Sequence, residues 1–164
     1  MITIIEATAQ EFKTIQEIAH IAWPFTYKDI LSKTQIEYML DLFFSDVAMH
    51  TCLANGHHFL IVKQANEPIG FASYEPHHQN KKQTRLHKLY LLPETQGKGV
   101  GQLLIQAVEN KAKENNDQTI SLNVNRFNKA YLFYLKNGFQ IISEENLEIG
   151  KGYFMEDYKM EKQL

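Results

Sequence analysis

The chain has 164 residues, a size that suits one domain with a substantial apolar core. Hydrophobic residues make up 44% and charged residues 22%, and a formal net charge of −2 gives no electrostatic reason to expect a nucleic acid or an anionic membrane as partner. The one cysteine, Cys52, excludes an internal disulfide and fits a reducing compartment.

The N-terminal segment has neither the basic start nor the small-residue cleavage site of a signal peptide. No apolar run reaches the roughly 20 residues that a membrane-spanning helix requires. We therefore expect a cytoplasmic protein without a membrane partner.

Strand and helix signals follow one another along the first third of the chain. A β-branched start predicts a strand over Ile2–Ala7. Apolar residues at helical spacing predict helices over Gln10–Trp23 and Lys33–Phe44, the first of them ended or kinked by Pro24. A shorter helix is expected over Asp46–Asn55.

The remaining elements predict a sheet interrupted by two helices. The expected strands are His58–Gln64, Pro68–Glu75, Thr84–Leu92, Thr119–Val124, Phe139–Glu145 and Tyr153–Met160, and the expected helices are Val100–Ala112 and Asn128–Lys136. The order βαα(α)βββαβαββ, without repeats or linkers, predicts an α/β or α+β fold in a single domain over residues 1–164.

A glycine-rich stretch lies between a predicted strand and a predicted helix. Residues 96–101 read Gln-Gly-Lys-Gly-Val-Gly, so free amide groups at a helix N-terminus, with Lys98 beside them, are available to a phosphate. The P-loop pattern is absent, and the dinucleotide fingerprint fails because Gln102 stands where its last glycine belongs. A tight turn without a ligand is the plain alternative.

Gln96, Gly99 and Gly101 meet the pattern Gln/Arg-x-x-Gly-x-Gly/Ala, which resembles the coenzyme A pyrophosphate loop of the GNAT superfamily of N-acetyltransferases. Residues 89–94 (Leu-Tyr-Leu-Leu-Pro-Glu) resemble the strand end before that loop. Residues 130–139 are similar to the family's A-x-x-x-Y-x-x-x-G-F segment. The order of elements also resembles the family across nearly the whole chain, which implies a central mixed, mostly antiparallel sheet flanked by helices.

The resemblance implies acetyl-CoA as cosubstrate. Backbone groups of Leu89, Tyr90 and Leu91 would contact its pantetheine arm. The expected pyrophosphate contacts are Gln96, Gly97, Lys98, Gly99, Val100, Gly101 and Gln102. Asn128 is expected to contact the pantetheine, although it stands one residue later than the family's asparagine, and Asn125 is the other candidate.

Acetyl transfer to an amine requires a base for the ammonium proton and an acid for the leaving thiolate. Tyr134 aligns with the family's general-acid tyrosine, and its alternative role is that of a core aromatic residue. His87 is the candidate base, because some members have Glu or His at that place; the alternative is a solvent-facing strand residue. Asn123 stands where other members keep a catalytic Glu and cannot act as a base, and Glu75 is a third option.

The resemblance implies an acceptor pocket at the connection between the first two predicted helices, residues 23–30. Trp23 and Tyr27 would form aromatic walls and Asp29 would be available to a cation. The alternative is a hydrophobic plug over the sheet.

The histidines give no metal motif in the sequence. They include the adjacent pairs 57–58 and 77–78, and neighbouring residues of a strand point to opposite faces of the sheet. We therefore expect no metal.

These observations predict an N-acetyltransferase that moves an acetyl group from acetyl-CoA to a primary amine of a small molecule or protein, directly in a ternary complex. The alternatives are a catalytically inactive acyl-CoA-binding module of the same fold, and a nucleotide-binding enzyme of another fold. A homodimer through the C-terminal strands is plausible by analogy with the family alone.

Overall fold

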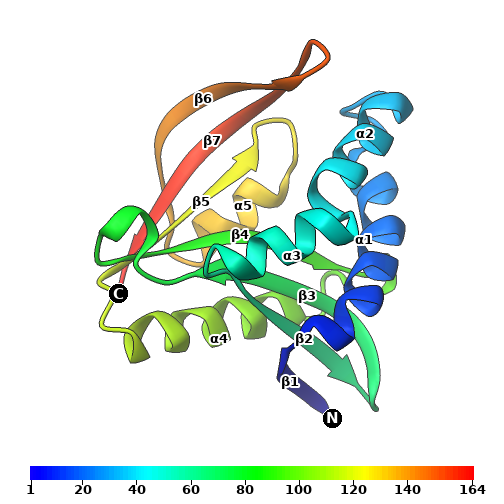
Figure 1. The fold of residues 1–164 in the computed structure, drawn as a ribbon. Coiled ribbons are helices and arrows are strands. Elements are labelled where there is room, and N and C mark those ends of the chain that lie inside the picture. The colour runs from blue at the N-terminus through cyan, green and yellow to red at the C-terminus, as the bar shows by residue number, and fades with distance from the viewer.

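The computed structural model describes residues 1–164 and contains one seven-stranded sheet with helices on both faces (Figure 1). The strands are β1 (Ile2–Ala7), β2 (His58–Gln64), β3 (Glu67–Glu75), β4 (Gln83–Leu91), β5 (Thr119–Asn125), β6 (Gln140–Gly150) and β7 (Tyr153–Gln163). The helices are α1 (Phe12–Tyr27), α2 (Lys33–Phe44), α3 (Asp46–Ala54), α4 (Val100–Glu114) and α5 (Ala130–Lys136). None of these helices combines the length and apolarity that crossing a lipid bilayer requires.

The strands lie in the order β1-β2-β3-β4-β5-β7-β6. Neighbouring strands are antiparallel except β4 and β5, which run parallel because α4 makes the crossover between them. The mixed, mostly antiparallel sheet and the predicted order of elements are confirmed, with α3 present as the third helix of the first group.

Each face of the sheet carries its own apolar core. On one face, α4 packs Leu104 and Val108 against Leu86 of β4. On the other face, α1, α2 and α3 cover a cluster that includes Ile15 and Phe71. Burial of both faces fixes the central strands, so the ends of these strands are rigid positions for functional side chains.

The first helix is longer than predicted, because α1 continues past Pro24 to Tyr27. Pro24 has no backbone N–H group, so the carbonyl of His20 lacks its hydrogen-bond donor within the helix. Both residues are exposed, so water reaches that carbonyl. Trp23 and Tyr27 are buried in the core under the helix and stabilise its last turn. The predicted end of the helix at Trp23 is therefore wrong.

The last two strands are also longer than predicted, because β6 extends to Gly150 and β7 to Gln163. Residues 145–150 lack the alternation of a half-buried strand, and most of β6 is exposed. Backbone pairing with β7 from Gln140 to Gly150 holds the strand extended, and sequence patterning does not report such pairing.

Candidate functional site

The parallel strands β4 and β5 separate partway along their length. They pair only between Gln83–Leu86 and Thr119–Leu122. On its other edge β4 stays paired with β3 as far as Leu91, opposite Gly70. The edge of β4 at Leu89–Leu91 therefore has free backbone groups that face a gap in the sheet.

The glycine-rich loop follows directly after this free edge. Gly97 and Gly99 have φ values of +78° and +81°, in the left-handed region where a side chain is strained. A Cβ atom at either position would meet nothing within 4 Å, so this side of the loop is open to a ligand.

Gly101 is required for a different reason. It lies in the first turn of α4, and a Cβ atom there would stand 3.1 Å from Cζ of Phe133 on α5. The absence of a side chain therefore lets α4 and α5 approach closely beside the loop.

The amide groups of residues 97–102 donate to no acceptor within the chain. The first amide of α4 with a backbone acceptor is that of Leu103, which donates to the carbonyl of Gly99 at 3.3 Å. Successive free N–H groups at the positive end of a helix dipole form an anion site. The sequence predicts a phosphate contact at this segment, and the geometry suits one.

A cavity of about 760 Å³, here named the loop cavity, lies beside these amides. Its lining includes ten of the residues predicted to contact acetyl-CoA: Leu89, Tyr90, Leu91, Gln96, Gly97, Gly99, Gly101, Gln102, Asn128 and Tyr134. Lys98 is exposed and lies outside the lining, and the side chain of Val100 is buried in the core, so only its amide remains available. Asp29, predicted for the acceptor pocket, lines this cavity instead.

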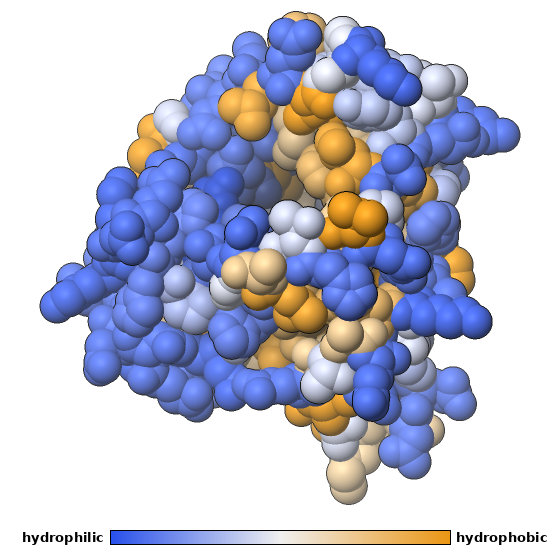
Figure 2. Space-filling model, in the orientation of Figure 1, coloured by the Kyte–Doolittle hydropathy of each residue, from blue (hydrophilic) through white to orange (hydrophobic).

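A second cavity of about 400 Å³, here named the aromatic cavity, lies under α1 and α2. It is lined by Trp23 and Tyr27, together with apolar residues of β6 and β7 such as Leu147 and Phe154. Figure 2 shows the corresponding face hollowed between the β6–β7 hairpin and the helices, with apolar side chains gathered on the helix side.

A cluster of three aromatic residues in tilted and edge-on contact, Trp23, Tyr27 and Tyr90, forms one wall of the aromatic cavity. The Tyr27 and Tyr90 hydroxyls are 2.9 Å apart, and the Trp23 ring lies 5.4 Å from that of Tyr90. Trp23 and Tyr27 are nevertheless part of the core under α1. The two residues thus pack in the core under α1 and also line the aromatic cavity.

Tyr134 lies where the two cavities meet. The residues that line both cavities are Leu89, Tyr90, Asn128, Ala130 and Tyr134. Burial raises the pKa of Tyr134, with a smaller contribution from Tyr27, so its phenol stays protonated near neutral pH and can donate a proton.

The two candidate asparagines lie between β5 and α5, with Asn125 at the end of the strand and Asn128 in the turn that follows. The Asn128 carboxamide oxygen accepts a hydrogen bond from the amide of Ala130 at 3.0 Å, and Asn125 makes the same type of turn with Phe127 at 2.9 Å. Only Asn128 lines both cavities, which places it nearer to the loop than Asn125.

His87 occupies a β-bulge in β4. Ser73 pairs with Lys88 and Tyr74 with Leu86, so His87 is the extra residue of its strand. Its Nε2 lies 2.9 Å from Oε1 of Glu75, and burial lowers the pKa of His87 to about 3. The imidazole lines the aromatic cavity in its neutral form.

Asp157 on β7 is a site residue that sequence reasoning missed. It is 4% exposed, lines the aromatic cavity, and lies opposite Asn125 in the strand register. Burial raises its pKa to about 6, partly offset by the Asn123 amide, whose nitrogen lies 3.3 Å from the carboxylate. No motif surrounds Asp157, so only the pairing of β5 with β7 reveals it.

Asn123 connects two acidic side chains. Its amide nitrogen lies 2.9 Å from the carboxylate of Glu145 as well as 3.3 Å from that of Asp157. Asn123 cannot act as a base, but its amide group donates hydrogen bonds that orient the carboxylates of Glu145 on β6 and Asp157 on β7.

A model of the acetyltransferase (GNAT) family matches residues 13–139. The uncharacterized N-acetyltransferase YuaI of Bacillus subtilis (strain 168) is 24% identical over 151 residues, which are 91% of this chain and 86% of that protein.

Solved structures share the fold over the full chain. The crystal structure of the PaiA N-acetyltransferase from Thermoplasma acidophilum in complex with coenzyme A is 27% identical, with a TM-score of 0.83 and coverage of 100% of this chain and 99% of that one. A GCN5-related N-acetyltransferase from Rhodopseudomonas palustris is 20% identical, with a TM-score of 0.84 over 99% of this chain and 95% of that one. The second likeness concerns the fold alone.

Proposed function

The chain belongs to the GNAT family of acetyltransferases, and on that basis we propose that it transfers the acetyl group of acetyl-CoA to a primary amine within a single domain. The observation that carries the proposal is the position of Tyr134, a protonated phenol where the loop cavity and the aromatic cavity meet. An acid at that point lies between a donor held by the loop and an acceptor held by the aromatic wall.

The loop cavity is the proposed donor site. The free amides of residues 97–102 suit the pyrophosphate, and the free edge of β4 at Leu89–Leu91 suits the amide groups of the pantetheine arm. The coenzyme A bound by the Thermoplasma acidophilum relative, at 27% identity, supports this assignment.

The aromatic cavity is the proposed acceptor site. Its walls are mostly apolar, and Asp157 supplies a carboxylate within reach of a cation. A volume of about 400 Å³ suits a small amine or one side chain of a protein. The acceptor is therefore proposed to be a primary amine on an apolar body.

In the proposed reaction the amine attacks the thioester carbonyl and the C–S bond breaks. Asp157 takes the proton that the ammonium group loses, since a base with a pKa of about 6 is ionised at neutral pH and still has affinity for a proton. A backbone N–H group near Leu91 stabilises the oxyanion. Tyr134 donates its proton to the departing thiolate, and the phenolate takes in return the second proton that the nitrogen loses as the amide forms.

The role of His87 as an alternative base stays a prediction. Its Nε2 is held by Glu75 and its pKa is about 3, so it is a weaker proton acceptor than Asp157 at neutral pH. We therefore assign the role of base to Asp157 in this proposal.

Calorimetric titration with acetyl-CoA, followed by a screen of primary amines for release of free CoA thiol, tests the proposal. Binding of acetyl-CoA together with amine-dependent thiol release supports it. Binding without thiol release for any amine would identify an acyl-CoA-binding module without catalysis. Absence of binding, with NAD or ATP bound instead, would overturn the assignment of the donor.

A further inference from the structure

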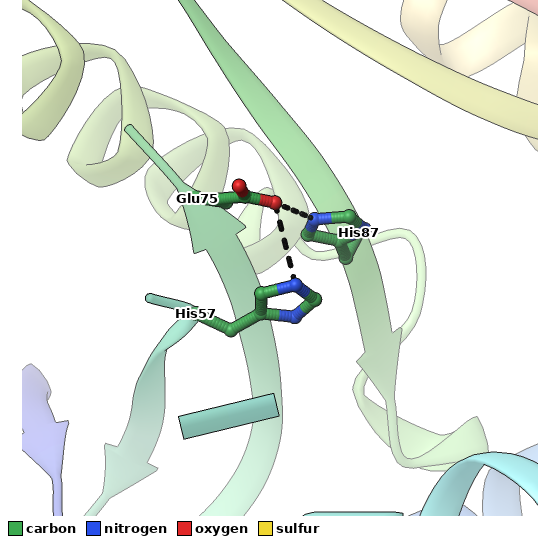
Figure 3. A group of neighbouring side chains, drawn as sticks. All are labelled: His57, Glu75 and His87. Carbon is green, nitrogen blue, oxygen red and sulfur yellow. Dashed lines mark hydrogen bonds and ion pairs between the residues drawn. The ribbon is translucent and has the colours of Figure 1, made fainter. Parts of the chain in front are cut away.

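Three side chains from separate segments converge at one end of the sheet. His57 precedes β2, Glu75 ends β3 and His87 lies in the bulge of β4. Figure 3 shows both imidazole rings directed at the carboxylate of Glu75. Oε1 of Glu75 lies 3.3 Å from Nε2 of His57 and 2.9 Å from Nε2 of His87.

The bulge makes this convergence possible. In a regular strand His87 and Lys88 would point to opposite faces, because side chains alternate. The extra residue in β4 frees His87 from this alternation, and its ring stacks on that of His57 with centroids 3.9 Å apart. His57 and His87 thus meet from two different segments, whereas the histidine pairs 57–58 and 77–78 are adjacent in sequence.

The donor atoms have the type and spacing of a transition-metal site. Two imidazole nitrogens and one carboxylate oxygen lie within 4.8 Å of one another. Ligands at about 2.0–2.2 Å from a tetrahedral zinc ion lie about 3.3–3.6 Å apart, so small side-chain rotations bring these atoms into place. We propose that His57, Glu75 and His87 bind one divalent ion of the zinc class.

The surroundings complete the arrangement. Nδ1 of His78 lies 3.0 Å from the same Oε1 of Glu75, and a hydrogen bond from this ring holds the carboxylate, as partners of metal-ligating carboxylates do. The three ligand side chains are 14–22% exposed, which leaves a path for the ion.

The fourth coordination position faces the aromatic cavity. His57 and His87 both line that cavity, and three protein ligands leave one position open to water or another molecule. Arg85 and Lys88 also line the aromatic cavity, and their positive charges repel the ion. The negative charge of the Glu75 carboxylate offsets this repulsion. The ligands are other residues than Tyr134 and Asp157, although two of them lie in the wall of the proposed acceptor site.

The experiment uses the full chain without a histidine tag, freed of metal by a chelator. Zn²⁺ titration by calorimetry should give one equivalent bound, and Co²⁺ in its place should give the intense visible absorption of a four-coordinate site. Glu75→Gln and His57→Ala should each weaken Zn²⁺ binding by more than about tenfold. The matched control is His58→Ala, which removes the adjacent, exposed histidine and should leave binding unchanged.

Circular dichroism and acetyl-CoA titration of each variant separate loss of the ion site from loss of the fold. Retained acetyl-CoA binding with lost Zn²⁺ binding supports the proposal. Zn²⁺ binding that is absent in the unmodified protein, or that survives both substitutions, would overturn it, whether or not the protein transfers acetyl groups.

Discussion

The two cavities are built from different parts of the polypeptide. The loop cavity owes its chemistry to main-chain groups of one continuous segment, residues 97–102, next to the free edge of β4. The aromatic cavity is lined by residues from four helices, α1, α2, α3 and α5, and from four strands, β4 to β7. Recognition by backbone amides depends on conformation, whereas recognition by side chains depends on residue identity.

This difference separates two kinds of specificity. A donor held by amide groups tolerates changes of side chain, provided that the left-handed glycines are kept. An acceptor held by aromatic rings and one carboxylate changes with each substitution in its walls. Within this family fold, we expect the acceptor to be altered more readily than the donor.

The largest expected effect tests whether the junction of the cavities is the site of chemistry. Tyr134→Phe removes the phenolic proton and should lower kcat by about 10²–10⁴-fold, because the thiolate leaves without an acid. The affinity for acetyl-CoA should stay within about twofold by calorimetry, since the ring remains. Tyr131→Phe on the same helix is the matched control, because Tyr131 lines neither cavity. An equal loss of donor affinity would contradict the acid role.

The second effect concerns the one acidic group of the aromatic cavity. Asp157→Asn should lower kcat/KM by about 10²-fold at pH 7.5. In the unmodified enzyme, kcat/KM should rise with pH through about 6, as the carboxyl of Asp157 loses its proton. The rise should vanish in the variant and persist in the control Glu156→Gln. A pH profile unchanged by Asp157→Asn would transfer the role of base to another group, with His87 the next to test.

The same substitution should stabilise the fold. The pKa of Asp157 is 3.8 before burial and about 6 in the folded state, so stability falls as pH rises from about 4 to about 6 and stays reduced above that. A pKa difference of about 2 corresponds to at most about 3 kcal/mol. Asp157→Asn should therefore gain about 2 kcal/mol in urea unfolding at pH 7.5 and almost nothing at pH 4. An equal gain at both pH values would contradict burial of the charge as its cause.

The smallest effect tests the main-chain cavity. Gly99→Ala places a Cβ atom at φ +81°, which costs roughly 1–2 kcal/mol of stability, and it puts a methyl group on the open side of the loop. Acetyl-CoA affinity should fall by about fivefold. Gly56→Ala has the same kind of strain at φ +87°, also with nothing within 4 Å, but outside both cavities. If both variants bind acetyl-CoA equally, the loop does not contact the donor.

The continuous parts of the site could be predicted from the sequence. The loop at residues 96–102 and the helix that carries Tyr134 are each predicted by a motif of residues close together in the sequence. Residues of both segments line the loop cavity. Strand pairing across long separations carries no such local signal. Asp157 reaches the site only through the register of β7 with β5, and His87 meets His57 and Glu75 only because of the bulge.

Asp29 illustrates the same limit. Its nearness in sequence to Trp23 and Tyr27 predicts one pocket for all three residues. Tyr27 ends α1, and the chain then turns, so that Asp29 lies with the glycine-rich loop while the aromatic residues face the other cavity.

Trp23 is the one tryptophan of the chain, and its ring lies in the wall of the aromatic cavity. Its indole nitrogen is buried and has no hydrogen-bond partner. All indole fluorescence of the protein therefore comes from one position beside the proposed acceptor site, and an amine that enters the cavity changes the surroundings of that single emitter. The fold thus carries its own optical reporter, by which candidate amines can be ranked for binding without acetyl-CoA and without turnover.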